Sequence, residues 1–494
     1  MRTTNRQPLP VLQLLALSLA ALCIHGYHLG VDDAEIYHPS ARKLLNPQLY
    51  PFNGSFFLSH AHLSLFSPLL ATTARLSHLS IDAVLFGWYL VTLFAAVAAC
   101  WKLASVCFAS SRARWSAVAL VTAVISMPAA NTGLLLMDPY LTARSFSTPL
   151  TLFALAFLLE ERTLAASVAI VLTASLHPQM AAYLVFFAAI FFLMRHWPAC
   201  KRLSSNQMAA FAGILPTGFH LAAADGAYRE ALYSRDYYFL ANWAWYHWLG
   251  MIGPLAFFYW FSRSRLRNTR PAFARLSMAV LPFGIVPILI ALFLSSSHRF
   301  DSFARLQPLR VYHLITLLLI LLLGGVLGEY LSGKRIWIMV GILLAASAGL
   351  FASARMTYPN SPQIECPGVA ASNPWVRTLY WIRSNTPQNA VFALDAHYLS
   401  DPVSDLHGFR AISERSSLAD YVKDGGAVSI FPALAENWKQ QSTATTGLNH
   451  FKAEDFAKLH QQYPVASWTV LHGNAPAGLE CPYQQDGYAV CLIR

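Results

Sequence analysis

The chain has 494 residues, of which 56% are hydrophobic and only 12% carry a charge. Soluble domains carry about 25% charged residues, so this composition excludes an ordinary soluble protein and indicates a polytopic membrane protein. The net charge of +11 does not indicate nucleic acid binding, because residues 355–494 hold 10 Lys/Arg and 12 Asp/Glu and the basic excess lies in the apolar part of the chain.

Eleven apolar runs predict an α-helical polytopic membrane protein with about eleven transmembrane helices in residues 1–354. Three runs are short for a span of about 20 residues. The runs cover residues 9–25, 81–109, 115–130, 145–159, 163–177, 180–194, 208–223, 246–262, 274–296, 311–330 and 336–353. The first run has a basic start but no clear cleavage site, which favours an uncleaved helix over a signal peptide.

The distribution of charge predicts the orientation in the membrane. Alternating the runs from a cytoplasmic N-terminus places 15 Lys/Arg on the inner side and 9 on outer loops. The positive-inside rule therefore predicts a cytoplasmic N-terminus and an extracytoplasmic segment from residue 355 onward. Nine of the twelve acidic residues before residue 355 fall on the outer side, so we expect a functional site there.

The first outer loop, residues 26–80, opens with Asp32, Asp33 and Glu35 directly after the first apolar run. Acidic side chains beside a membrane are costly unless they face water or protein, so they mark a functional site by default. A carboxylate here would act as a general base or hold a divalent metal. The alternative is that the Asp pair caps a helix beginning near Ala34.

Later outer loops carry cations that suit a phosphate group. Arg144 lies in MDPYLTARSFSTPL, and Arg299, Arg305 and Arg310 lie in HRFDSFARLQPLR. Arginine binds phosphate through two parallel hydrogen bonds, although snorkelling to lipid headgroups would also explain these residues.

Two further residues of the outer loops are candidates with a plain structural alternative. Asp138 is either a second carboxylate of the site or the turn former of an Asp-Pro pair. His177, in LHPQM, is a candidate contact to a sugar.

Residues 355–494 read as a small soluble α/β domain behind a Pro-rich linker. NPWVRTLYWIRSNTP, LAENWKQQ and AEDFAKLHQQY predict helices, and AVFAL, ASWTVLHG and YAVCLI predict strands. Cys481 and Cys491 bracket PYQQDGYAV, which reads as a hairpin arm and makes them a disulfide candidate. Cys366 is the competing partner.

One helix followed by a long outer loop with Asp32, Asp33, Tyr37 and Arg42, and then by many helices and a soluble tail, resembles the GT-C superfamily of polyprenyl-phosphate-sugar-dependent glycosyltransferases. ARSFSTPL, HPQM and RLQPLR are similar to outer-loop signatures of its bacterial members. The resemblance implies transfer of a sugar from a polyprenyl-phosphate donor to a lipid, glycan or protein acceptor outside a bacterial plasma (inner) membrane, in contact with membrane lipids.

The resemblance also implies roles for individual residues. Asp32 or Asp33 would be catalytic, and Asp33 with Asp138 would hold a divalent metal such as Mg²⁺ or Mn²⁺. The candidates for binding substrate or lipid phosphate are Arg144, Arg305, Arg299, Arg310, His177 and Glu35.

Two other functions remain open from the sequence. A lipid or glycan transporter or flippase would place charged residues at mid-membrane, whereas the acidic residues here cluster at outer helix ends. A non-catalytic scaffold of the same architecture is the second alternative. Phosphate-binding loops, dinucleotide-binding glycine motifs and metalloprotease or hydrolase motifs are all missing from the sequence. Gly324-Gly325, inside an apolar run, is typical of helix packing.

Overall fold

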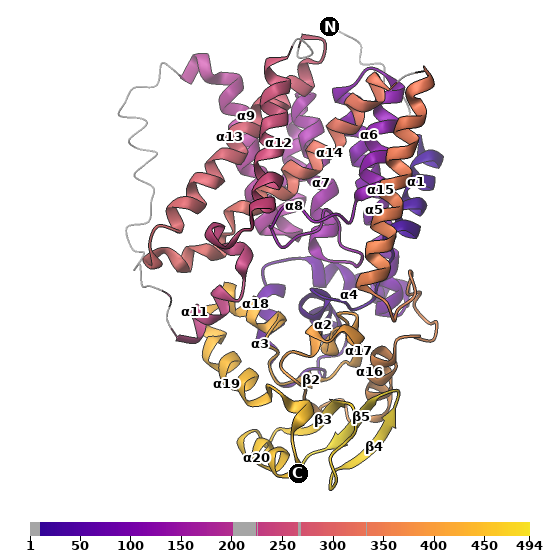
Figure 1. The fold of residues 1–494 in the computed structure, drawn as a ribbon, viewed down its shortest axis with the longest axis vertical. Coiled ribbons are helices and arrows are strands. Elements are labelled where there is room, and N and C mark those ends of the chain that lie inside the picture. Colours follow the sequence, from indigo (N-terminus) through magenta and orange to yellow (C-terminus); the bar gives the residue numbers. More distant parts are fainter. Residues whose placement is uncertain (1–9, 201–223, 225, 265–267, 332) are drawn as a thin grey trace.

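The computed structural model describes residues 10–200, 224, 226–264, 268–331 and 333–494. A bundle of apolar helices forms one end of the molecule, and a smaller region with a five-stranded sheet, formed by the C-terminal residues, lies at the other (Figure 1). We refer to residues 358–494 as the tail and to the end of the bundle that it covers as the tail end.

The bundle is built from helices that pack against one another. They are α1 (Val11–His25), α5 (Ile81–Cys107), α6 (Ser111–Val124), α7 (Ala143–Leu159), α8 (Thr163–Leu176), α9 (Pro178–Cys200), α12 (Trp245–Arg263), α13 (Pro271–Leu294), α14 (Val311–Tyr330) and α15 (Ile336–Thr357). The first loop folds as α2 (Ala34–Leu45), α3 (Ser55–Ala61) and α4 (Phe66–Ser77), and α11 (Gly226–Tyr233) lies between α9 and α12 in the sequence.

Five segments of the described chain are long and apolar enough to cross a membrane. They are Ile81–Cys107, Pro178–Arg195, Pro271–Leu294, His298–Tyr330 and Gly333–Thr357. Helices α1, α7 and α8 are apolar but shorter. The chain is thus a mostly helical protein with helices suited to a membrane, as predicted, but the count of eleven spans is not confirmed.

Helix length explains the difference for α1, α6, α7 and α8, whereas α12 has 19 residues and falls short in hydropathy. The run predicted at 115–130 forms only the 14 residues of α6, about 21 Å at 1.5 Å per residue, which is less than the roughly 30 Å of a bilayer core. The run at 246–262 forms α12, and the run at 208–223 lies outside the described residues.

Helix α14 lies deepest in the bundle and packs closely on α6. A Cβ atom added at Gly324 would lie 2.9 Å from the backbone oxygen of Ser116, and one at Gly328 would lie 2.4 Å from the Ser116 hydroxyl. These glycines therefore allow the two backbones to approach, as the sequence predicted for Gly324.

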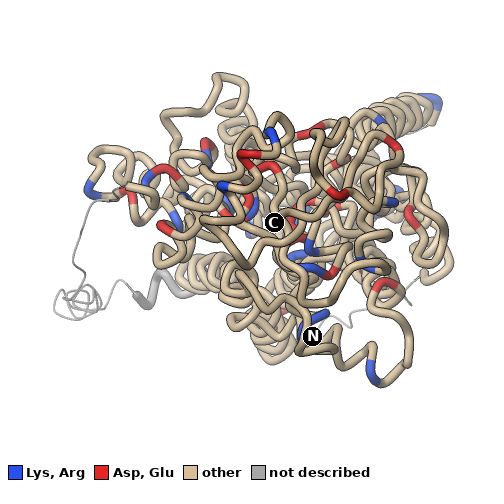
Figure 2. The backbone as a smooth tube through the Cα atoms, turned by 90° about the horizontal axis from the view of Figure 1, so that it is seen from below, with Lys and Arg blue, Asp and Glu red and all other residues tan. Residues whose placement is uncertain are grey.

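Charged residues of the bundle gather at its two ends. At the end far from the tail, Lys102 pairs with Glu160, Arg270 pairs with Glu329, and Arg195 pairs with Glu161. Figure 2, viewed from the tail side, shows acidic and basic residues intermingled across the other end. Apolar side chains exposed between the two ends suit a lipid environment.

The tail is a small α/β unit with sheet order β2-β1-β3-β5-β4. Its strands are β1 (Val391–Ala393), β2 (Ser416–Ser417), β3 (Ala466–His472), β4 (Glu480–Gln485) and β5 (Tyr488–Leu492), and its helices are α16 (Pro374–Asn385), α17 (Phe409–Ser413), α18 (Lys423–Ile430), α19 (Ala435–Thr445) and α20 (Ala453–Gln462). Strands β1, β2 and β3 run parallel, whereas β5 is antiparallel to β3 and β4. The three predicted helices and three predicted strands are all present.

The predicted disulfide is present between Cys481 and Cys491, on the paired strands β4 and β5, with their Cα atoms 3.9 Å apart. Cys366 is a free, exposed cysteine.

The tail packs firmly on the first loop of the bundle. Val31 forms a β-bridge with His407, the Tyr50 hydroxyl donates to the Arg410 carbonyl (2.9 Å), and Asn53 donates to Gln441 (2.6 Å). Arg42 bonds both Asp82 of α5 (2.5 Å) and Glu414 of the tail (2.6 Å). These contacts hold the tail against the end of the bundle.

This arrangement makes the predicted topology testable. Asn268 follows α12 at the far end and Asn474 lies in the tail. We expect reporter enzymes fused at these two residues to report opposite sides of the membrane, with Asn268 cytoplasmic because its loop is the most basic. Readings from the same side at both fusion points would contradict the predicted topology.

Candidate active site

A polar cavity of about 270 Å³ lies where the first loop, the tail ends of several helices and the tail meet. It is lined by Asp32, Asp33, Ile36, Tyr37, His60, Gly133, Arg144, Arg235, Tyr237, Tyr238, Gln307, Arg310, Val422, Lys423, Gly426, Ala427 and Ile430. Five ionised side chains of the bundle and one of the tail therefore face one space.

Arg144 joins two carboxylates at the base of this cavity. Its Nη2 donates to Asp33 Oδ2 (2.9 Å) and to Asp138 Oδ2 (2.8 Å), and only 7% of its side chain is exposed. The Ser145 hydroxyl accepts from the Thr142 backbone N–H (3.1 Å) at the start of α7, whose first turn contains Arg144. Both carboxylates consequently lie near the positive end of the helix dipole.

Asp32 has a backbone conformation that few residues adopt. Its φ is +53°, in the left-handed region, where Asp is tolerated better than most side chains. The Tyr140 hydroxyl donates to Asp32 Oδ2 (2.9 Å), and the other oxygen contacts the Lys423 ammonium. Neither Asp caps a helix, because Asp33 precedes α2 without accepting a side-chain capping bond. The capping alternative is therefore wrong for both residues.

Lys423 reaches the acidic pair from the tail. It begins α18, and its Nζ donates to Asp33 Oδ1 (2.9 Å) besides contacting Asp32. Asp420 holds the start of this helix by accepting from the Lys423 backbone N–H (2.5 Å). One residue later on the helix, Asp424 points away from the cavity toward Arg410.

Arg310 and Arg235 add positive charge to the opposite wall. Arg310 Nη1 donates to Gln179 (3.3 Å), and its guanidinium lies 5.8 Å from the Tyr237 ring centroid. The buried Nε atoms of Arg310 and Arg235 have no hydrogen-bond partner within the described chain. Four cations and two carboxylates line the cavity, and the buried Asp138 beside Arg144 adds a third carboxylate, so the cavity carries a surplus positive charge that suits an anion.

The pKa values of the two carboxyl groups bound to Arg144 shift in opposite directions. Burial would raise the pKa of Asp33, but Lys423 and Arg144 outweigh it and hold the pKa well below its usual range. For Asp138, burial raises the pKa and Arg144 opposes the shift only in part. Asp33 is therefore a firmly ionised carboxylate.

Only some of the residues predicted for this site line the cavity. Asp32, Asp33, Arg144 and Arg310 line the cavity, and Asp138 lies behind Arg144. His177 is buried nearby, where burial first and then the charges of Arg144 and Arg310 keep its pKa well below normal. Arg299 and Arg305 are exposed and do not line the cavity.

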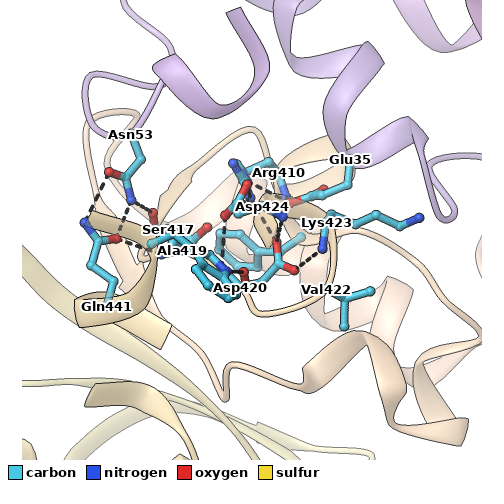
Figure 3. Close-up of polar contacts among 12 residues, drawn as sticks. Glu35, Asn53, Arg410, Ser417, Ala419, Asp420, Val422, Lys423, Asp424 and Gln441 are labelled. Carbon is cyan, nitrogen blue, oxygen red and sulfur yellow. Dashed lines mark hydrogen bonds and ion pairs between the residues drawn. The ribbon is translucent and has the colours of Figure 1, made fainter. Parts of the chain in front are cut away.

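Glu35 is also absent from the cavity. Its carboxylate is fully buried and accepts from the Arg410 side chain and from the backbone N–H groups of Arg410 and Ala411, each at 2.9 Å. Figure 3 shows Arg410 between Glu35 on one side and Asp420 and Asp424 on the other. Glu35 therefore attaches the tail to the first loop instead of binding substrate.

The side chains present do not fit the divalent metal that was expected at Asp33 and Asp138. A guanidinium already bridges these two carboxylates, and an ammonium bridges Asp32 and Asp33. Within the described ranges, no group of three or more His, Cys, Asp and Glu side chains is arranged to hold a metal ion. The cations already bound to these carboxylates take the place that a metal ion would need.

Several residues that line the cavity were not predicted as site residues, among them Lys423, Arg235 and His60. Lys423 and Arg235 belong to segments far from the acidic pair in sequence, and no local spacing marks them. His60 and His62 lie two residues apart, so on a helix their side chains point in different directions, which argues against a metal-binding pair. His60 instead packs edge-on against Phe431, with 5.4 Å between the ring centroids. The one available signal was the charged stretch ISERSSLADYVKDGG of the tail.

No protein-family model matches this chain, and no curated protein matches it either.

The buried cluster around Arg410 yields a pH prediction. Burial raises the pKa of Asp424 to about 8; Arg410 opposes this shift and Asp420 adds to it. The folded tail thus holds a proton that the unfolded chain releases near the ordinary aspartate pKa of 3.8. The contribution of Asp424 to stability is therefore largest in acid and falls as the pH rises toward about 8.

We expect this fall to amount to at most about 1.4 kcal/mol per pH unit between pH 5 and pH 8. Asp424→Asn, which mimics the neutral carboxyl, should flatten the curve in thermal unfolding of the full chain. Glu480→Gln, in an exposed ion pair of the same domain, is the matched control and should leave the slope unchanged. Equal slopes for Asp424→Asn and the parent chain would contradict this assignment.

Proposed function

We propose that this chain is a membrane glycosyltransferase of the GT-C kind, which transfers a sugar from a lipid-phosphate donor to an acceptor at the tail end of the bundle. The observation that carries the proposal is that the acidic pair, Arg144 and Arg310 share one polar cavity at the ends of apolar helices. This combination supplies the carboxylate and the cations that the reaction requires.

Arg310 is the residue that we assign to the lipid phosphate. It lines the polar cavity and also a narrow crevice that runs into the bundle between α7, α9 and α14. The crevice includes the apolar Leu184, Leu314 and Leu317. A phosphate held by Arg310 would therefore keep its lipid chain on the membrane side and its sugar in the cavity.

The two carboxylates have separate roles in this proposal. Asp33 stays ionised between Arg144 and Lys423, and a base with so low a pKa is weak, so it positions these two cations. Asp32 is more exposed, with 38% of its side chain accessible, and is the base. It accepts the proton of the acceptor hydroxyl as that oxygen bonds to the sugar anomeric carbon. The bond to the phosphate oxygen breaks, and the leaving phosphate takes the electron pair beside Arg310.

The placement of charge favours transfer over transport. A flippase needs polar groups along a path through the bilayer, whereas the ion pairs recorded in the described segments lie near one end of the bundle or the other. The residues that line the cavity lie at the end of the bundle that the tail covers.

The test uses cells that lack this chain. We expect them to accumulate one polyprenyl-phosphate-linked sugar, detected by mass spectrometry of lipid extracts, and to lose one glycoconjugate. Re-expression of the parent chain should reverse both changes. Asp32→Asn should not, because loss of the base costs about 10²–10⁴ in rate.

Glu454→Gln is the matched control, since it neutralises an exposed carboxylate of α20 remote from the cavity. It should restore the lipid pool, and all variants should be present in membranes at equal amounts. Restoration by Asp32→Asn, or an unchanged pool of lipid-linked sugars in cells without the chain, would refute the proposal.

A further inference from the structure

A second pocket, of about 280 Å³, lies inside the tail and shares no lining residue with the cavity described above. It opens where the parallel strands β1 and β3 end: Leu394 and Asp395 follow β1, and His472 is the last residue of β3. Ligands of α/β sheets bind outside the carboxyl ends of the parallel strands, so the location itself favours a binding site.

The inner wall of this pocket is aromatic. Trp375 lies between Tyr398 and Tyr488, with ring centroids 5.8 Å and 5.2 Å away. His472 stacks on Tyr488 at 5.0 Å with an interplanar angle of 22°. Flat rings of this kind offer electron-rich faces to the C–H groups of a ligand ring.

The rim of the pocket is polar and only partly satisfied. His472 Nδ1 lies 2.6 Å from Asp401 Oδ2, Asp395 Oδ1 accepts from the His397 backbone N–H (2.9 Å), and Asn449 Oδ1 accepts from the His472 backbone N–H (2.9 Å). Asp395 Oδ2, the Asn449 amide nitrogen and His472 Nε2 form no hydrogen bond with any residue that the structure describes. These atoms leave one acceptor, one donor and one group of either kind for a ligand.

The charges of the lining residues indicate which kind of ligand the tail pocket binds. Two carboxylates line the pocket, and none of the lining residues is Lys or Arg. An anion is therefore disfavoured, whereas a ligand with several hydroxyl groups satisfies acceptors and donors together. The volume lies at the low end of small-molecule sites, which fits one or two sugar rings. We propose that this tail pocket binds a neutral monosaccharide or disaccharide.

The pocket adjoins the contact that holds the tail over the polar cavity. The Tyr398 hydroxyl accepts from the Phe409 backbone N–H (3.0 Å) and donates to Glu35 Oε1 (3.4 Å). A saccharide in the tail pocket would thus be held beside the Glu35–Arg410 pair. This binding stands independently of any transfer reaction in the cavity.

The experiment measures binding to the full chain in lipid nanodiscs by saturation-transfer NMR and isothermal titration. The probes are glucose, galactose, mannose, N-acetylglucosamine, arabinose, maltose and lactose. We expect at least one to bind, and the double variant His397→Ala/His472→Ala to weaken it about tenfold through loss of a hydrogen bond and a stacked ring. Both side chains are exposed, so the double variant keeps the core of the domain.

Two controls assign the binding to this pocket. His450→Ala removes an exposed histidine next to Asn449 that does not line the pocket, and Asp32→Asn changes the polar cavity of the bundle; both should bind the saccharide as the parent does. Failure of every probe to bind, equal binding by the double variant, or loss of binding in Asp32→Asn would overturn the proposal. If Asp32→Asn binds the saccharide as the parent does but fails to restore the lipid pool, the tail pocket and the polar cavity act independently.

Discussion

The ion pair of Glu35 and Arg410 is the contact on which the arrangement of both pockets depends. Both side chains are at most 1% exposed, and they come from residues 375 positions apart. An ion taken out of water needs partners, and Glu35 has a guanidinium and two backbone N–H groups, although burial still raises its pKa. Removal of either partner of such a buried pair typically costs about 3–5 kcal/mol.

This pair also determines the chemistry of the polar cavity. Arg410 bonds Asp424, and the residue before Asp424 is Lys423. The Lys423 ammonium contacts both Asp32 and Asp33. The tail consequently supplies one of the charges that keep Asp33 ionised, while Arg144 of the bundle supplies the other. A rigid link between the two parts is what lets a residue of the tail act in a cavity of the bundle.

The sequence predicted the elements of the fold better than their number of membrane crossings. Apolar periodicity locates α6 and α12, but it does not say where a helix ends, and a helix of 14 residues does not cross a bilayer unaided. Strand patterns such as AVFAL and YAVCLI and the Cys481–Cys491 pair were predicted correctly, because each depends on residues close together in the chain.

The candidate site was predictable only in part, for reasons of geometry. Asp33 and Glu35 look like one acidic patch in the sequence, yet two residues along a helix are separated by about 200° of rotation. Asp33 therefore faces the cavity and Glu35 faces the tail. The convergence of Asp33 with Arg144 and Arg310 was expected only from a family resemblance. Lys423 was not expected at all, because no sequence pattern reports which residue of the tail lies above the first loop.

The same contacts imply that the tail and the bundle form one unit. A tail separated from the bundle would lose Glu35 from Arg410 and the Tyr50 hydroxyl from the Arg410 carbonyl, and would expose the surfaces that now cover Val31 and Asn53. Three acidic side chains share Arg410 in the intact chain, and only Glu35 belongs to the bundle. Arg410 would keep Asp420 and Asp424 in the isolated tail. Separation would therefore remove the contacts between the tail and the first loop, and this contact surface also forms one wall of the polar cavity.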